Sequence, residues 1–173
     1  MLERLDMLMD MDTIQENGET GLLTLLFEAR LQYQSDMEGV VSAETREGEL
    51  VGSGDGTVSG DLLSGKARWS MYAGNCAYVF VRAGLLPPLG QHLCTVHPAG
   101  VIETSDGAEI WFDAKGYGLR GADQGQPHLW ALTMAVQFTT TDQRYQWLNT
   151  TLGVVVSEFD EQAGRALWRA FVL

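Results

Sequence analysis

The chain has 173 residues, enough for one domain with a full core, and 45% of them are apolar. It carries 23 acidic and 11 basic residues, a net charge of −12, which argues against binding to nucleic acid or to anionic membrane surfaces. No apolar run approaches the roughly 20 residues of a membrane span, and the acidic start lacks a signal-peptide pattern. We therefore expect a cytoplasmic protein without nucleic acid or membrane partners.

Residues 1–20 are acidic and rich in methionine, and Leu2, Leu5, Leu8 and Met9 stand at helical spacing. The pattern allows a short helix that ends by Asn17 and Gly18. We expect an irregular or helical N-terminal extension over residues 1–20, followed by a single domain over residues 21–173.

Most of that domain shows the alternation of half-buried strands. Apolar and polar residues alternate over 23–33, 63–71 and 128–138, and two more strands are expected over 152–158 and 166–172. The glycine-rich residues 52–56 are expected to form a loop, and residues 145–149 a helical turn. Many short antiparallel strands with almost no helix predict an all-β barrel that is closed or nearly closed.

One loop is unusually apolar. Leu85, Leu86 and Leu89 flank Pro87 and Pro88, and proline cannot donate to a central strand. A loop this apolar is expected to be covered, either in a subunit contact of a homo-oligomer or over the mouth of the barrel.

The best-defined local feature is a hairpin turn at Asp106 and Gly107, a dipeptide typical of tight two-residue loops. With a two-residue loop, Glu103 pairs with Ile110. One face of the hairpin then carries these two residues together with His97, Ala99, Val101, Phe112 and Ala114. This small, apolar face is expected to point inward.

His97 is the candidate catalytic residue on that face. It is either a core histidine that is hydrogen-bonded to backbone or carboxylate, or a general acid/base, because imidazole titrates near neutral pH. Its small neighbours Ala99 and Val101 would leave room for a ligand. Glu103 lies too far along the strand to contact His97 and is expected at the rim.

Two motifs that could bind phosphate or metal fail on inspection. Residues 60–67 nearly spell a phosphate-binding loop, but Ala67 replaces the required hydroxyl and a strand follows instead of a helix. His92 and Cys94 share one face of a strand while His97 points the other way, so the three cannot readily close on one ion. We expect neither a metal nor a cofactor.

Three stretches resemble the small barrel proteins catalogued as domain of unknown function 3237, also called uncharacterised protein family 0311. They are Gly56–Gly60 running into Lys66–Trp69, the hairpin Ile102–Ile110, and Tyr145–Val154, which is similar to the family's Tyr-x-Trp-Leu-Asn turn. The resemblance covers residues 21–173. It implies a lipocalin-sized antiparallel barrel, often oligomeric, with no agreed general activity.

The chain departs from the commoner family pattern at Arg68, where many relatives have an acid. It also departs at His97 and Ala99, where an acid and an arginine are usual. The resemblance implies that these positions line the lumen, so their change implies a less charged ligand in this chain.

Three functions are compatible with the sequence. The first is a cofactor-independent isomerase, cyclase or dehydratase (a lyase) acting on a small apolar or aromatic molecule, with His97 as the proton-transfer group. The second is a small-molecule-binding protein with the same pocket and no turnover. The third is an oligomeric barrel whose core is filled by its own side chains. The predicted ligand-binding residues are Tyr33, Trp69, Ala99, Val101, Glu103, Phe112, Tyr145 and Asn149.

Overall fold

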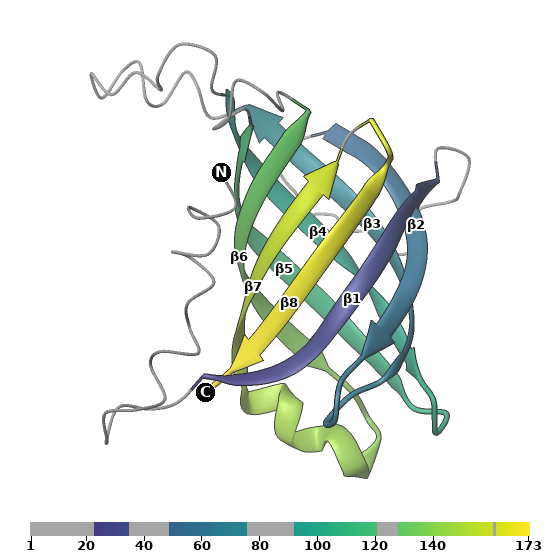
Figure 1. The fold of residues 1–173 in the computed structure, drawn as a ribbon. Helices are drawn as coiled ribbons and strands as arrows, with labels where there is room; N and C mark the ends of the chain where they lie inside the picture. The colour runs from purple at the N-terminus through teal and green to yellow at the C-terminus, as the bar shows by residue number, and fades with distance from the viewer. Residues whose placement is uncertain (1–22, 35–48, 76–91, 121–127, 161) are drawn as a thin grey trace.

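The computed structural model describes residues 23–34, 49–75, 92–120, 128–160 and 162–173. These residues form eight strands and one 3-10 helix, η2 (Figure 1). In chain order the elements are β1 (Thr24–Gln34), β2 (Glu49–Ser59), β3 (Gly65–Asn75), β4 (His92–Thr104), β5 (Glu109–Arg120), β6 (Leu129–Thr139), η2 (Gln143–Thr150), β7 (Leu152–Asp160) and β8 (Arg165–Val172).

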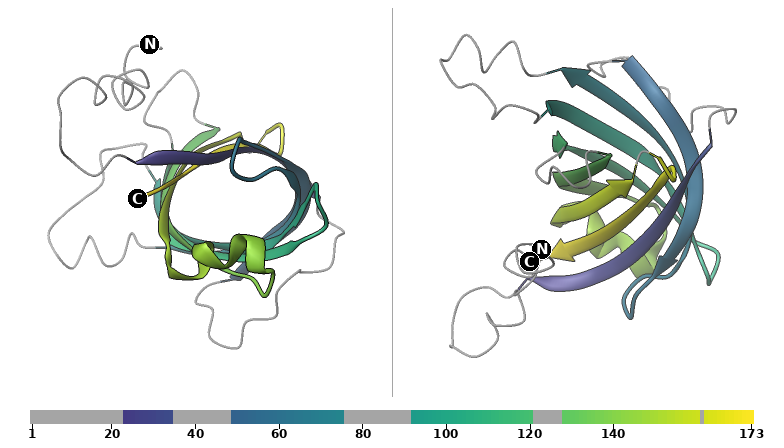
Figure 2. Two further views of the ribbon diagram at one scale, coloured as in Figure 1. Left: turned by 90° about the horizontal axis from the view of Figure 1, so that it is seen from below. Right: turned by 45° about the horizontal axis from the view of Figure 1, so that its top comes forward.

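The strands close into one antiparallel barrel. Each strand pairs with the next along the chain, and β1 also pairs with β8. Closure removes every open sheet edge and surrounds a single core. Viewed from below, the barrel has an oval section with η2 lying along its rim (Figure 2). The predicted all-β antiparallel barrel is confirmed.

Two sequence expectations lie outside the described residues: the extension over 1–20 and the apolar loop at 85–89. The oligomer expected from that loop stays a prediction. Within the part of the chain that the structure describes, there is no helix long and apolar enough to span a membrane.

Side-chain alternation explains the core. In β6 the buried residues Leu132, Met134, Val136 and Phe138 alternate with exposed neighbours. β1 follows the same rule over Phe27, Ala29 and Leu31 after a register shift next to Phe27. A period of two places one set of side chains inside a barrel and the other outside.

The predicted register of the β4–β5 hairpin is wrong by one residue. Asp106 and Gly107 do occupy the turn, but Glu103 pairs with Glu109 and not with Ile110. The loop has three residues, 105–107, and Gly107 adopts a positive φ of 88°. Three-residue hairpin loops use a residue of this kind at their third position. The extra loop residue exchanges the inner and outer faces of β4 relative to the prediction.

The predicted loop over residues 52–56 is also wrong, since these residues belong to β2. Gly54 pairs with Tyr33 on one side and with Trp69 on the other. A Cβ atom at Gly54 would overlap the carbonyl oxygen of Gln32 and the indole of Trp69. Glycine here permits close approach of neighbouring side chains and backbone, which is its usual role within a strand.

The helix η2 covers the lower end of the barrel in Figure 1 and confirms the predicted helical turn. Asp142 caps it by accepting a hydrogen bond from the backbone N–H of Arg144 at 3.0 Å. Leu148 is fully buried. Asn149 holds η2 to the end of β6 through two hydrogen bonds with the backbone of Thr140. The Asn149 side-chain amide accepts from the N–H of Thr140 at 2.8 Å and donates to the carbonyl of Thr140 at 2.9 Å.

A charged network joins this helix to the β4–β5 turn. The Arg144 guanidinium donates to Asp106 and to Asp142, each at 2.7 Å. Its hydrogen bonds hold the pKa of Asp142 down at about 2. The hydroxyl of Thr104, followed by Tyr145 and Arg144, lowers the pKa of Asp106. The network ties two separate chain segments together beneath the barrel.

Acid should weaken this network. A carboxylate whose pKa is lower in the folded state than its unfolded value of about 4 stabilises the fold above that pH. The stabilisation is lost as the pH falls through the folded value. Between about pH 4 and pH 2, the Tm of the wild type should therefore fall more steeply than that of an Arg144→Met variant.

Arg68→Met is the matched control, because the side chains of Arg68 and Arg144 are both 51% exposed and each pairs with a carboxylate. Melting curves recorded by circular dichroism across this pH range give the comparison. Equal slopes for the wild type and Arg144→Met would contradict the assignment.

Candidate functional site

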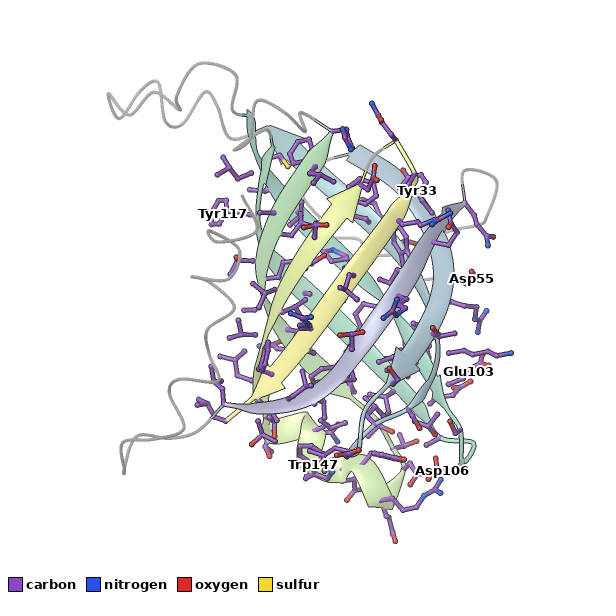
Figure 3. All side chains as sticks on the ribbon, in the orientation of Figure 1. Tyr33, Asp55, Glu103, Asp106, Tyr117 and Trp147 are labelled. Carbon is purple, nitrogen blue, oxygen red and sulfur yellow. The ribbon has the colours of Figure 1, made fainter. Side chains whose placement is uncertain are left out.

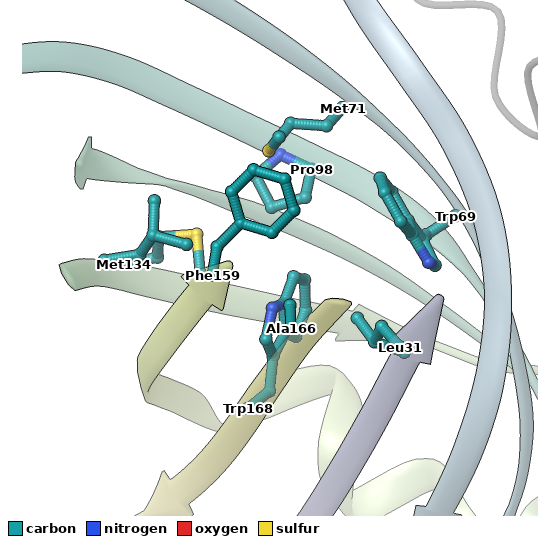
Figure 4. Close-up of a pocket in the computed structure, with 9 residues that line it drawn as sticks. Leu31, Trp69, Met71, Pro98, Met134, Phe159, Ala166 and Trp168 are labelled. Atoms are coloured by element: carbon teal, nitrogen blue, oxygen red, sulfur yellow. The ribbon is translucent and has the colours of Figure 1, made fainter. Parts of the chain in front are cut away.

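The described residues line a small, partly open cavity near the upper end of the barrel, where β1 and β7 end and β8 begins. Its volume is about 20 Å³. The walls are apolar side chains from six strands, shown in Figure 4: Leu31, Trp69, Met71, Pro98, Leu132, Met134, Phe159, Ala166 and Trp168. A space of this size holds about one water molecule.

An aromatic cluster surrounds the cavity. Tyr33 packs against Trp69 with ring centroids 5.6 Å apart and against Phe159 at 6.2 Å. Burial raises the pKa of the Tyr33 phenol, so this group is uncharged at neutral pH. Phe159 is only partly buried, whereas Trp69 is 4% exposed. Among the aromatic residues that line the cavity, Phe159 is therefore the one most accessible to solvent.

Two buried polar atoms of the lumen have no hydrogen-bond partner. They are the indole Nε1 of Trp69 and the Oγ of Ser157. The indole of Trp69 lines the cavity through its apolar atoms, whereas Ser157 is not among the lining residues. Ser157 faces inward on β7 between two lining residues, because it pairs with Leu132 and with Trp168. Buried polar groups normally have partners, so each of these is a candidate ligand contact.

Among the inward positions whose side chains the structure describes, there is no carboxylate, imidazole, ammonium or guanidinium group. The titratable side chains among them are the phenol of Tyr33 and the thiol of Cys94, which packs against the core. The lumen can bind and orient an apolar molecule. None of its described side chains exchanges a proton readily near neutral pH.

His97 lies on the outer face of β4, contrary to prediction. Because the register differs by one residue, the residues on either side of His97, Val96 and Pro98, face inward instead. Val96 is buried in the core, and Pro98 lies in the cavity wall. The imidazole Nε2 hydrogen-bonds Asp113 Oδ1 of β5 at 2.7 Å. The side chain of His97 is 14% exposed, whereas that of Asp113 is 53% exposed. The basis for a lumenal acid/base role of His97 is thereby removed.

Ala99, Val101 and Glu103 follow His97 to the outer face for the same reason. Glu103 points away from the barrel (Figure 3) and accepts a hydrogen bond from Arg68 at 2.9 Å. Ala99 and Val101 are buried, but they share their face with His97 and so do not line the lumen. None of the three can contact a molecule bound inside the barrel.

Three predicted ligand-binding residues do face the lumen: Tyr33, Trp69 and Phe112. Phe112 packs edge-to-face against Trp168 with centroids 5.7 Å apart. The remaining two predicted residues belong to the lower end. Asn149 binds Thr140, and the Tyr145 hydroxyl donates to Asp106 Oδ2 at 3.1 Å. Both stabilise the closure under the barrel and lie on the far side from the cavity.

Sequence reasoning missed most of the cavity wall. Pro98 and Phe159 were hidden, the first by the register error and the second by its place at a strand end. The alternation of β6 and β8 signalled the inward position of Leu132, Met134 and Trp168, though not their proximity to Trp69. Among the described residues no cluster of His, Cys, Asp or Glu could hold a metal ion.

No protein-family model and no curated protein sequence matches the chain. Solved structures do match its fold. A β-barrel-like protein from Acinetobacter baumannii AYE is 20% identical, with a TM-score of 0.61 over 91% of this chain and 99% of that one. A conserved protein of unknown function from Rhodopseudomonas palustris is 19% identical, with a TM-score of 0.59 over 88% and 99%.

A third structure, a protein of unknown function from Clostridium acetobutylicum ATCC 824, is 14% identical, with a TM-score of 0.57 over 90% of this chain and 99% of that one. At these identities the likeness concerns the fold alone. The similarity agrees with the barrel described above and does not indicate a substrate.

Proposed function

We propose that the protein binds a small, uncharged, flat molecule in the upper part of the barrel lumen and does not turn it over. The observation that carries this proposal is the apolar, aromatic cavity, whose lining residues include Trp69 with its unpaired Nε1. Ligand sites in proteins are mostly apolar with a few polar groups that orient the ligand. Among the inward side chains that the structure describes there is no charged group, which favours binding over acid/base catalysis.

The site must open to admit a ligand. Its volume of about 20 Å³ is far below the roughly 150 Å³ of a dry cavity that holds benzene. Phe159 is the partly exposed aromatic side chain in the wall, and its ring has the size and shape of the expected ligand. Rotation of Phe159 out of the lumen would vacate the space that a flat molecule needs.

The same small volume favours one alternative, a barrel filled by its own side chains that binds nothing inside. A filled eight-stranded barrel is physically reasonable. The two functions differ in one measurable respect, because a filled barrel takes up no apolar probe.

Titration calorimetry with indane, an apolar bicyclic probe, tests the proposal. The wild type should bind it, and Phe159→Ala should bind it roughly tenfold more tightly, because the ring no longer competes for the site. Phe171→Ala is the matched control: Phe171 is partly exposed and lies on β8 at a position that alternates with the buried Ala170 and Val172. This control should bind indane as the wild type does.

A wild-type protein that remains folded and binds no indane would contradict the proposal and support the filled barrel. Binding by Phe159→Ala alone would lead to the same conclusion, since the site would then exist only after its creation by mutation.

A further inference from the structure

We infer that the ligand of this site carries a hydrogen-bond acceptor on the edge that meets Trp69 and a second polar group on the opposite edge, which meets Ser157. This inference rests on the proposed function and specifies the class of molecule. Aryl ketones, aromatic lactones and quinones with a hydroxyl or second carbonyl belong to that class.

The requirement for an acceptor comes from Trp69. The indole Nε1–H can only donate, it is buried, and it has no acceptor among its neighbours. The ring of Tyr33 packs at 61° to the indole, and an aromatic face is at best a weak acceptor. An unpaired buried donor costs free energy of about 1–3 kcal/mol. A ligand carbonyl beside Trp69 would recover part of that cost.

The second polar group comes from Ser157, which is 9% exposed and whose Oγ has no partner. Trp69 belongs to β3 and Ser157 to β7, which are four strands apart in a barrel of eight and therefore lie on opposite walls. They lie at the level of the cavity, because Leu132 and Trp168, the cross-strand partners of Ser157, line it together with Trp69. The cavity itself is bordered by apolar atoms, so a ligand would reach Nε1 and Oγ only in the opened site. A hydroxyl both donates and accepts, so either a carbonyl or a hydroxyl on the ligand suits Ser157.

A charged ligand is disfavoured on both electrostatic and solvation grounds. Among the inward side chains that the structure describes, there is no cation to pair with a carboxylate or phosphate, and burying an unpaired ion is costly. The net charge of −12 also repels anions before they reach the mouth. An uncharged polar group satisfies Trp69 and Ser157 without that cost.

Two probes of nearly the same shape test the Trp69 contact: 1-indanone, which has a ketone, and indane, which lacks it. The wild type should bind 1-indanone roughly tenfold more tightly than indane, the effect of one satisfied hydrogen bond. Trp69→Phe keeps an aromatic ring without the donor, so this preference should fall to about twofold or less while indane still binds. Equal affinities of the wild type for the two probes would overturn the inference.

The Ser157 contact is tested in the same way with 5-hydroxy-1-indanone and 1-indanone. The added hydroxyl should improve binding several-fold in the wild type and should have no effect in Ser157→Ala. An equal gain in both proteins would show that the hydroxyl meets another group. Failure of every probe to bind would contradict the proposed function itself, which separates that outcome from a failure of this inference.

If Trp69→Phe does not fold, nuclear magnetic resonance of the wild type gives a second readout. The chain has five tryptophans, and one indole N–H resonance should move downfield with 1-indanone. The same resonance should show no comparable shift with indane. The absence of any selective shift would overturn the inference without the need for a variant.

Discussion

Trp168→Ala is expected to destabilise the protein by about 3–5 kcal/mol, the usual cost of truncating a buried tryptophan. Trp168 is 5% exposed, lies in the cavity wall and packs edge-to-face against Phe112. Its removal leaves a void that closely packed strands cannot collapse to fill. For a chain of this length, the loss corresponds to a fall in Tm of about 6–20 °C.

Trp111→Ala is the matched control for that experiment. Trp111 lies on the outer face of β5 and is 43% exposed, so its truncation should cost less than about 1 kcal/mol. Urea denaturation with a shared baseline measures both changes in free energy of unfolding. Comparable losses for the two variants would show that Trp168 is not part of a tightly packed core.

Gly100→Ala is expected to have the second largest effect, about 3 kcal/mol, at the upper end of the range for overpacking. Gly100 faces the lumen on β4 between Trp69 and Phe112. A methyl group there would overlap the carbonyl oxygen of Arg68 and would lie 2.9 Å from Cζ of Phe112. The carbonyl belongs to the β3–β4 hydrogen-bonded pair, so it cannot move without disturbing the ladder.

Gly107→Asn gives the comparison at an open position. No atom lies within 4 Å of a Cβ built on Gly107, and asparagine tolerates positive φ better than other residues with a side chain. It should cost less than about 1 kcal/mol, whereas Gly100→Ala should lower the Tm by about 6–12 °C. If Gly100→Ala has the same Tm as the wild type, the strands around Gly100 can move apart without a measurable loss of stability.

Much of the fold could be predicted because alternation is a direct record of which side of a sheet each residue faces. Leu132, Met134 and Val136 were placed correctly by this rule alone. The glycines of β2 could not be placed in this way, because glycine supplies no side chain to the pattern. Their role depends on Tyr33 and Trp69, whose positions become clear only once the strands are paired.

The candidate site was less predictable, because the residues that line it depend on whether the β4–β5 loop has two residues or three. A two-residue loop would have turned His97 inward, and the observed three-residue loop turns Pro98 inward instead. The Asp-Gly pair is compatible with both loops. The inward orientation of Trp69 is predicted correctly, since its strand has its own alternation, independent of the hairpin. Phe159 could not be found, because nothing in the local sequence shows which strand ends meet at the mouth.

Leu148 and the Asp106–Arg144 network close the lower end of the barrel. Under the proposed function, a bound molecule would therefore enter and leave at the upper end, where Phe159 lies. With one route, a bound ligand must dissociate before a second ligand can bind. If Phe159 opens the site as proposed, the residence time of the ligand depends on how often its ring rotates away, and a change at position 159 would alter the entry and exit rates together.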